Sequence, residues 1–202
     1  MTRSKQRRSY NLGRRGESAE ETRRRIVEAT FALHMEQGIA ETTMKQIAER
    51  AGVSIGTVYH HFPTYPDAIA ACGAFTAEHV PIPSEALFEG ASARQQRIER
   101  LFAAFFDYYQ RLPVLASVRR DQHLASALRE FAAHEAALRR DLAARAINAS
   151  AKDPRVKLIA ALADFDVHGA LARQGYSTRE AAAKAAALAN AWLDANDKPP
   201  NP

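Results

Sequence analysis

The sequence has a single cysteine, Cys72, and no apolar run long enough to cross a membrane. One thiol cannot build an internal disulfide framework, and low cysteine use is typical of a reducing compartment. The sequence also lacks a glycine-rich phosphate loop, an internal repeat and sustained strand-like alternation. Positive charge at the N-terminus is not followed by an apolar segment, so no secretory signal is predicted. These absences favour a helical, cytoplasmic protein without a membrane partner.

Positive charge is concentrated at one end of the chain. The 202 residues carry a net charge of +5, but residues 1–25 contain nine Arg and Lys against three Glu, which leaves the rest almost neutral. A local basic segment suits a polyanionic partner. The plainer alternative is a solvated tail with no partner. We expect residues 1–17, which are polar and rich in arginine, to form a disordered basic arm.

Helix-start and helix-stop signals predict an all-α chain. Four capping boxes of the form Ser/Thr-x-x-Glu/Gln support helix starts: Ser18–Glu21, Thr43–Gln46, Ser92–Gln95 and Ser177–Glu180. Asp153 followed by Pro154 marks a further start. The predicted helices span about 18–37, 43–51, 54–60, 64–80, 93–111, 114–119, 121–149, 154–173 and 177–195. The proline-rich tail, 197–202, cannot continue the last helix and is expected to be disordered.

Residues 42–62, TTMKQIAERAGVSIGTVYHHF, have the spacing of a helix-turn-helix unit. Ala48 is small where two helices approach closely, and Gly52 stands four residues later, where the turn requires a positive φ. Val53 follows as an apolar anchor, and Val58 is the next apolar position. The spacing therefore predicts two short helices that cross at a steep angle.

The outer face of the second short helix is polar where a buried helix would be apolar. Its small residues allow close approach, while hydroxyl and imidazole groups offer hydrogen bonds to base edges and phosphates in a major groove. The alternative is a helical hairpin whose polar face has no partner. The side chains on this face are Ser54, Ile55, Gly56, Thr57, Tyr59, His60 and His61.

Residues 22–70 resemble the DNA-binding domain of the tetracycline-repressor (TetR) family of bacterial regulators. The matching elements are Arg25-Ile26 with Ala29 and Leu33 before Gly38, Thr43-Met-Lys-Gln-Ile47-Ala48, Ala51-Gly-Val-Ser54, and Gly56-Thr-Val-Tyr59-His-His-Phe62-Pro63. The resemblance implies an all-helical homodimer with an N-terminal three-helix DNA-binding unit. It also implies a C-terminal effector domain and, usually, repression released by a small ligand.

The resemblance also implies which residues contact DNA. The expected set is Thr43, Lys45, Ser54, Ile55, Gly56, Thr57, Tyr59, His60, His61 and Tyr65. Two positions depart from the family pattern. His34 stands where the family usually has Phe, and Tyr65 stands where it usually has a Lys that contacts a phosphate. A tyrosine hydroxyl can still meet a phosphate but without charge, so this contact is weakened.

The last two predicted helices carry stripes of small and apolar residues. Two such helices from each of two subunits can form a four-helix interface, which is where the resemblance places the dimer contact. The alternative is that both stripes pack inside one chain. The expected interface residues are Leu158, Leu162, Phe165, Gly169, Ala185, Leu188 and Trp192.

The predicted helix 93–111 has aromatic residues on more than one side, so other helices should surround it. These rings are expected either to form core or to line an effector pocket for an apolar or aromatic ligand. The residues of that pocket are Phe102, Phe105, Phe106, Tyr109, His123, Phe131 and Phe165. Arg119, Arg120 or His123 could meet a carboxylate.

Evidence for catalysis or for a metal is weak in the sequence. His123, Glu130 and His134 share one helical face, but histidines in such positions are more often exposed or hydrogen-bonded than metal-bound. Cys72 is expected to be a small buried thiol and not a redox sensor. No catalytic arrangement follows from spacing, so neither an enzyme nor a cofactor is predicted.

The interpretation is a dimeric, ligand-responsive transcriptional regulator that binds a palindromic double-stranded DNA operator. The expected domains are a DNA-binding domain, 18–64, and an effector-binding and dimerisation domain, 65–196. One alternative is an architectural DNA-binding protein without an effector. Another is a small helical enzyme that carries a helix-turn-helix.

Overall fold

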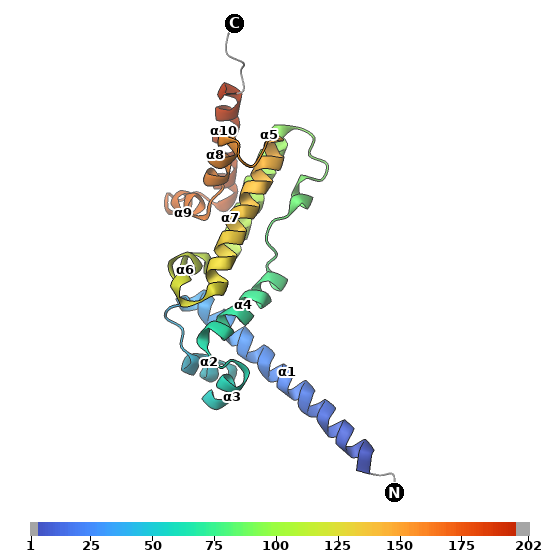
Figure 1. The fold of residues 1–202 in the computed structure, drawn as a ribbon. Helices are drawn as coiled ribbons and strands as arrows, with labels where there is room; N and C mark the ends of the chain where they lie inside the picture. The colour runs from blue at the N-terminus through green and yellow to red at the C-terminus, as the bar shows by residue number, and fades with distance from the viewer. Residues whose placement is uncertain (1–3, 197–202) are drawn as a thin grey trace. The chain divides into compact units, whose positions relative to one another are not determined.

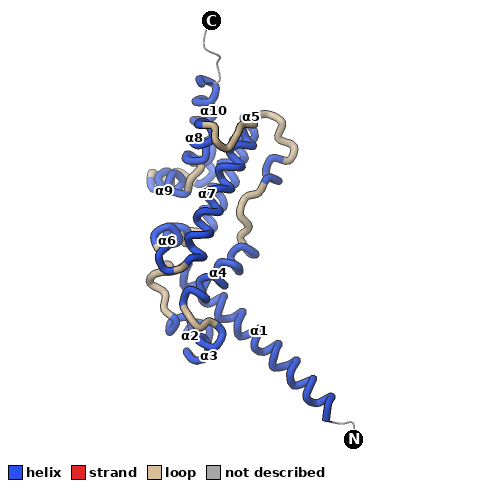
Figure 2. Tube along the Cα trace, in the orientation of Figure 1, coloured by secondary structure: helices blue, strands red, loops and turns tan. Residues whose placement is uncertain are grey.

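The computed structural model describes the backbone of residues 4–196 and the side chains from Ser18 to Asn196. Within that range every regular element is a helix, which confirms the predicted all-α class (Figures 1 and 2). No helix in the described range is both long and apolar enough to span a bilayer. The expected disorder of the tail, 197–202, concerns residues outside that range.

The chain divides into two compact units, and the division differs from the expected boundary at residue 64. The first unit comprises residues 1–79 and 120–128, and the second comprises 80–119 and 129–202. The fourth helix therefore belongs to the first unit, as does a short segment from much later in the chain.

The first unit is built from four α-helices and a 3-10 turn. Its elements are α1 (Ser4–Gln37), α2 (Met44–Ala51), α3 (Ile55–His61), α4 (Tyr65–His79) and η2 (Gln122–Leu124). One apolar core joins α1, α2, α3 and the start of α4, with Ile26, Ile47 and Val58 fully buried at its centre. Burial of these branched side chains is the main favourable contribution to the packing of such short helices.

In the second unit α9, α10 and η1 pack against α5, which keeps one exposed face. Its elements are η1 (Glu85–Phe88), α5 (Arg94–Arg111), α6 (Leu115–Arg120), α7 (Ser126–Ile147), α8 (Pro154–Leu162), α9 (Phe165–Arg173) and α10 (Thr178–Asn196). The described α6 and α7 each extend slightly across the division between the units. Helix α10 packs along α5 through buried alanines (Figure 1).

Two of the four predicted capping boxes are confirmed. Thr43 and Gln46 bond reciprocally at the start of α2, and Ser177 and Glu180 do so at the start of α10. The Ser92–Gln95 box is wrong, because α5 begins after Ala93 without a side-chain cap and the Gln95 amide instead donates to Glu99.

The predicted start of the first helix at Ser18 is also wrong. Helix α1 already begins at Ser4, so Ser18 lies inside it and its carbonyl accepts a bond from the Thr22 hydroxyl at 2.8 Å. Glu21 pairs with Arg24 and does not return to cap the helix. The preceding residues are mostly good helix formers, and only two glycines interrupt them, so the helix propagates backward. Residues 4–17 are thus helical, where a disordered arm was expected.

Two long predicted helices are interrupted. The predicted helix 121–149 becomes η2 followed, after Ala125, by α7. The predicted helix 154–173 breaks at Ala163–Asp164, where Asp164 caps α9 by accepting the Asp166 amide at 2.9 Å.

The break at Asp164 is associated with a buried charge cluster that joins α5, α6, α7 and α9. The Arg119 guanidinium donates two hydrogen bonds to the Asp164 carboxylate, at 2.7 and 2.9 Å, and Arg139 Nη2 forms an ion pair with Asp164 Oδ2 at 2.6 Å. Arg139 also bonds Glu135 and the Tyr109 hydroxyl, which donates to Glu135 at 2.6 Å. Burial raises the pKa of the Asp164 carboxyl, but the bonds from Arg119 and the Asp166 amide outweigh burial and lower that pKa.

In the first unit the two departures from the family pattern contact each other. The Tyr65 hydroxyl donates to the Ile39 carbonyl at 2.5 Å, so its oxygen accepts from His34 Nε2, 2.9 Å away. The other ring nitrogen, Nδ1, then accepts from the buried Cys72 thiol at 3.5 Å. Burial lowers the pKa of His34 to about 4 and raises the pKa of Cys72 to about 11. The chain of neutral groups therefore links α1 to α4.

The peptide group between Ile39 and Ala40 is hydrogen-bonded through both its carbonyl and its amide. Ile39 contributes the carbonyl that Tyr65 bonds, and the adjoining Ala40 amide donates to Asp121 Oδ2 at 3.1 Å. The Arg120 guanidinium donates two hydrogen bonds to the Asp121 carboxylate, and these bonds hold the pKa of Asp121 below its usual value. The loop between α1 and α2 is thus fixed by α4 and by the segment 120–128.

Replacing His34 with phenylalanine should remove part of the acid sensitivity of folding. A histidine buried as the neutral form binds a proton more readily when unfolded, so its contribution is complete above its unfolded pKa, near 6.5, and is lost as the pH falls toward 4. The free energy of unfolding of the native protein relative to H34F should fall by on the order of 3 kcal/mol over that interval. Urea titrations at several pH values measure it.

The wild-type protein itself supplies the control, because His168 and the carboxylates titrate in both proteins. Parallel pH profiles for the two proteins would contradict the buried, neutral state of His34.

Candidate nucleic-acid interface

The turn between α2 and α3 has the geometry that its glycine permits. Gly52 ends α2 with φ 65° and ψ 41°, in the left-handed region. Its amide donates to the Glu49 carbonyl at 3.2 Å, and the Val53 amide donates to the Ala48 carbonyl at 3.0 Å. These bonds satisfy the last carbonyls of α2 and turn the chain sharply. A side chain here would be strained and would meet Arg25 at 3.2 Å.

Helix α3 is short, and one residue anchors it. Val58 is its only fully buried side chain, and Ser54 caps the helix by accepting the Thr57 amide at 3.1 Å. The two hydroxyls also bond each other at 2.8 Å. The rest of the seven-residue helix is therefore free to face a partner.

The exposed face of α3 contains large apolar side chains that nothing in the described structure covers. Ile55 is 45% exposed and Tyr59 is 48% exposed, and Gly56 and His60 are exposed beside them. His61 is half-buried, and burial, His60 and Arg23 all lower its pKa, which favours the neutral ring. The structure thus brings six of the predicted positions, Ser54 to Thr57, Tyr59 and His60, to one face of α3 and its cap.

Two further predicted residues lie at the start of α2. Thr43 and Lys45 are both exposed, and Lys45 lies 3.8 Å from Glu49 in a solvated pair that carries little energy. A lysine so loosely held is free to exchange that partner for a phosphate.

Tyr65 does not join this surface. Its hydroxyl is engaged with His34 and Ile39, and the ring is half-buried between α1 and α4. The expected phosphate contact at Tyr65 is therefore unsupported, and its hydroxyl instead stabilises the domain.

Sequence reasoning missed three arginines that position the unit. Arg25 of α1 donates to the carbonyls of Ala51 and Gly52 and braces the turn. Arg23 lies over the buried Phe62 ring at 5.2 Å, just after α3. Arg50 makes two bonds to Glu36, at 2.8 and 2.6 Å, and ties α2 to α1. Helical spacing from the buried Ile26 would have placed Arg23 on the core side of α1, but the partners lie too far along the chain to be predicted.

The sequence profile described as bacterial regulatory proteins of the tetR family matches residues 26–64. This match lies entirely within the first unit. The match coincides with α2, α3 and the second half of α1, which form the surface described above.

Curated relatives are similar to this chain over the same region. The HTH-type transcriptional regulator SrpR of Pseudomonas putida is 50% identical over 44 residues, which cover 22% of this chain and 21% of the relative. The HTH-type transcriptional repressor KstR of Mycolicibacterium smegmatis is 42% identical over 48 residues, which cover 24% of each chain. The alignments thus span only about a fifth to a quarter of these relatives.

Solved structures share the fold of this chain at greater length. A transcriptional regulator from Rhodococcus sp. Rha1 aligns with a TM-score of 0.60 at 22% identity and covers 88% of this chain and 99% of its own. A TetR transcriptional regulator from Rhodococcus sp. RHA1 aligns with a TM-score of 0.53 at 16% identity and covers 89% and 98%. At this level of identity the likeness concerns the fold alone.

The predicted effector residues do not line an open space together. Phe102, Phe105, Phe106 and Tyr109 of α5 are buried in contact with one another, and Phe165 packs edge-on against Tyr109 at 5.5 Å. Phe131 is only half-buried. His123 is exposed and belongs to the first unit, so its place in this set is wrong. The rings of α5 therefore form a filled core with Phe165.

The predicted dimer residues separate into two groups. Leu188 is 68% exposed, while Leu158, Leu162, Phe165, Gly169 and Trp192 are half-buried. Ala185 is wrong as an interface residue, because it is 3% exposed and packs on the side of α10 that faces α5.

The residues weighed as metal ligands remain apart from any cluster. His123, Glu130 and His134 are all exposed. Among the described residues, no group of three or more potential ligands is placed to hold a metal ion.

Replacing Gly56 with alanine should weaken DNA binding without weakening the fold. An added Cβ would meet only Ser54 Oγ, at 3.8 Å, an ordinary contact. The helix should gain about 0.5–1 kcal/mol, whereas the methyl group would stand between α3 and a groove. We expect operator affinity to fall roughly tenfold or more, equivalent to about 1.4 kcal/mol. Thermal unfolding and fluorescence anisotropy measure the two effects.

Gly73→Ala is the matched control. Gly73 is an exposed glycine inside α4 whose Cβ would meet nothing within 4 Å. This variant should gain similar helix stability and retain full DNA binding. Equal affinities for G56A and G73A would show that the α3 face does not approach DNA.

Proposed function

We propose that the protein is a sequence-specific, DNA-binding transcriptional regulator, and that it acts as a repressor. The observation that carries this proposal is the face of α3, a short helix with one anchor and exposed Ile55, Gly56 and Tyr59. Such a helix fits a major groove, where side chains at its N-terminal end reach base edges. The tetR-family match over the same residues and the repressors among the relatives support it.

The proposal includes a homodimer on a palindromic operator. A two-fold dimer presents two recognition helices one or more DNA turns apart, so the operator repeats the symmetry of the protein. The exposed Leu188 and the half-buried Trp192 on α10, together with α8 and α9, are the surface that would form the contact.

The proposal also includes release from DNA by a small apolar or aromatic ligand bound in the second unit. About 2.7 kcal/mol of preference for one of two conformations would shift operator affinity about a hundredfold. Because the α5 rings are already packed together, a ligand among them would have to separate them. An adjacent cleft is an alternative that needs no such opening.

The competing function is an architectural protein that binds DNA without an effector. Selection of genomic fragments by the purified protein, followed by competition with scrambled DNA, separates the two. A regulator should prefer its selected fragment by roughly a thousandfold or more over unrelated DNA. Equal affinity for both DNAs would favour the architectural function.

Removal of residues 2–15 should reduce the salt dependence of DNA binding. The deleted segment contains six Arg and Lys, and each phosphate neutralised contributes about 0.9 to the slope of log affinity against log salt. Affinity for selected and unrelated DNA should fall together, because phosphate contacts carry no sequence information. Titrations at several salt concentrations measure both effects.

A full-length variant with the six basic residues changed to glutamine is the control for chain length. It should reproduce the deletion. If the slope is the same in all three proteins, the segment makes no phosphate contact.

Replacing Leu188 with glutamate should dissociate the dimer. The side chain is 68% exposed within one chain, so the change should leave the fold intact while placing two buried charges at a subunit contact. Gln110→Glu adds the same charge at an exposed position of α5 and serves as the control. Sedimentation velocity measures the mass. A wild-type monomer, or an L188E protein that remains dimeric, would contradict this interface.

A further inference from the structure

The buried charge cluster lies beside an open cleft between α7 and the α8–α9 pair. The cleft has a volume of about 380 Å³, within the usual range of small-molecule sites. Its lining is Ala136, Arg139, Arg140, Lys157, Ala160, Ala161, Asp164, Asp166 and Val167. All of these residues belong to the second unit.

The charges inside the cluster already balance. Arg119 and Arg139 neutralise Glu135 and Asp164, and both oxygens of Asp164 are fully used by the two arginines and the Asp166 amide. Asp164 therefore has little capacity left for a cationic ligand. The cluster fixes the wall of the cleft without attracting a cation into it.

The Arg139 guanidinium has one N–H group that bonds none of the described residues. Of its five N–H groups, Nε donates to the Ala160 carbonyl and Nη1 donates to Tyr109 and Glu135, while Nη2 forms an ion pair with Asp164. One N–H on Nη2 is left over. Arg139 is only 7% exposed and lines the cleft, so this donor is held in place by its other bonds.

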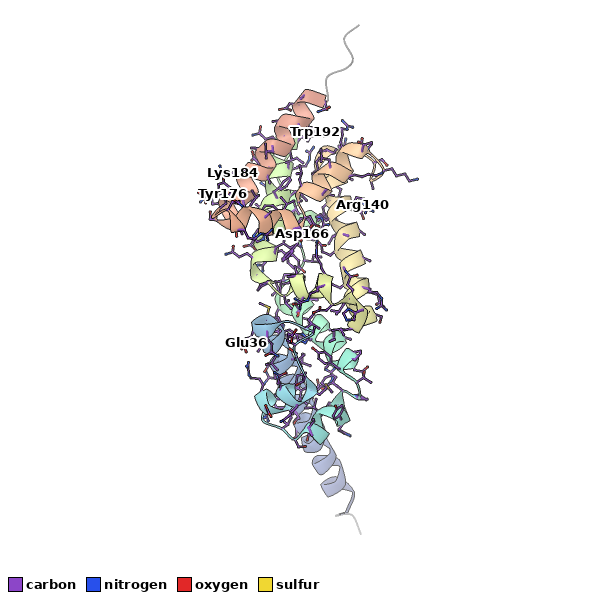
Figure 3. All side chains as sticks on the ribbon, turned by 90° about the vertical axis from the view of Figure 1, so that its left-hand side faces the viewer. Glu36, Arg140, Asp166, Tyr176, Lys184 and Trp192 are labelled. Carbon is purple, nitrogen blue, oxygen red and sulfur yellow. The ribbon has the colours of Figure 1, made fainter. Side chains whose placement is uncertain are left out.

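Two further cations stand at the mouth of the cleft. Arg140 of α7 and Lys157 of α8 are exposed, and neither side chain forms an ion pair or a hydrogen bond with the described residues. The acid at the mouth is Asp166, whose carboxylate is 81% exposed and lies 3.5 Å from Arg119. Figure 3 labels Asp166 and Arg140. The mouth thus carries two free positive charges against one partly paired negative charge.

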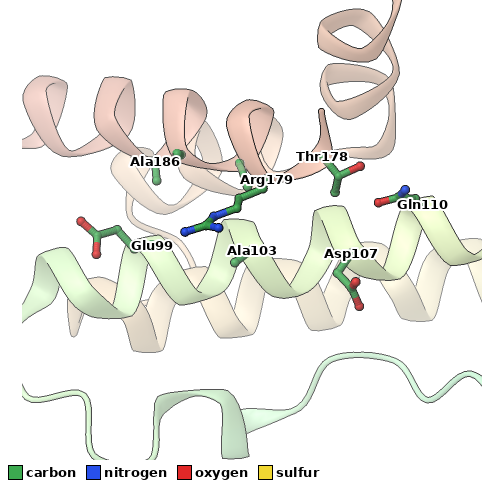
Figure 4. Close-up of a pocket in the computed structure, with 9 residues that line it drawn as sticks. Glu99, Ala103, Asp107, Gln110, Thr178, Arg179 and Ala186 are labelled. Atoms are coloured by element: carbon green, nitrogen blue, oxygen red, sulfur yellow. The ribbon is translucent and has the colours of Figure 1, made fainter. Parts of the chain in front are cut away.

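The remaining lining is apolar and small. Ala136, Ala160, Ala161 and Val167 leave space for a short hydrocarbon or a single ring beside the cations. A second hollow, of about 430 Å³, lies between α5 and α10. It is less suited to an anionic ligand, because the carboxylates of Glu99 and Asp107 flank Arg179 there (Figure 4).

We propose that the cleft between α7 and α8–α9 binds a small organic acid, with its carboxylate held by Arg139, Arg140 and Lys157 and its apolar body against the alanines and Val167. The proposal deepens the proposed function by naming the class of the effector, and it rests on that function. A guanidinium presents parallel donors that match a carboxylate, and the lysine adds a point charge.

Such a ligand would act on a cluster that is connected to the DNA-binding unit through the chain. Arg119 of the cluster is followed directly by Arg120, which donates a hydrogen bond to Asp121. Asp121 in turn accepts a hydrogen bond from the Ala40 amide. A bound anion that redistributes the donors of Arg139 changes the bonds available to Asp164 and hence to Arg119. This route needs no opening of the α5 aromatic core.

The test uses full-length protein and pairs of acids and amides of one shape: benzoate and benzamide, phenylacetate and phenylacetamide, octanoate and octanamide. Calorimetry and thermal unfolding at constant ionic strength measure binding. We expect at least one acid to bind and to raise the unfolding temperature, and its amide to bind roughly tenfold or more weakly.

Two exposed substitutions locate the site. Arg140→Gln and Lys157→Gln should each weaken acid binding roughly tenfold without changing the unfolding temperature of the free protein, because neither side chain has a partner to lose. Arg179→Gln, which removes the same charge from the other hollow, should leave acid binding unchanged.

Three results would overturn the proposal: no acid of the panel binds at millimolar concentration, acid and amide bind equally, or the double variant R140Q/K157Q binds the acid normally. None of these measurements contains DNA. The proposed function fails separately, if the protein free of acid shows no preference for selected genomic fragments.

Discussion

The position of α3 depends on its connection to α1 more than on its own stability. A helix of seven residues with one buried side chain is far too short to persist alone in water. The left-handed Gly52 sets its direction, Val58 anchors it, and Arg25 holds the carbonyls of the turn from α1. Because α3 contributes so little to the core, almost all of its surface is free for recognition.

Local signals predicted the helices well wherever no distant charge competed. The boxes at Thr43 and Ser177 are satisfied by neighbours three residues away, which the sequence displays directly. The same pattern at Ser18 has no such effect, since the residues before it continue the helix. The break at Asp164 was not predictable, because it is associated with two arginines located 45 and 25 residues earlier in the chain.

The candidate DNA-binding face was predictable because it depends on short spacing, whereas its supports were not. Ser54 to Thr57, Tyr59 and His60 are exposed or hydroxyl-bonded as the helix-turn-helix pattern implies, and Val58 between them is buried. Tyr65 was misassigned because each departure from the family pattern was interpreted separately. His34 and Tyr65 form one hydrogen-bonded pair, so a polar ring at the first position calls for a hydroxyl at the second. A single sequence shows the two residues but not their contact.

In the second unit the buried aromatic side chains and the exposed cations lie in different places. The phenylalanines of α5 fill their space with one another, which stabilises the unit but leaves no preformed opening among them. Two cations whose side chains pair with none of the described residues, Arg140 and Lys157, lie instead where α7 meets α8. Burying an arginine such as Arg139 costs a large free energy of desolvation unless most of its N–H donors have partners. The cluster meets that requirement with four bonds and leaves one donor directed by a rigid frame, so the cleft is already organised for an anion before any ligand arrives.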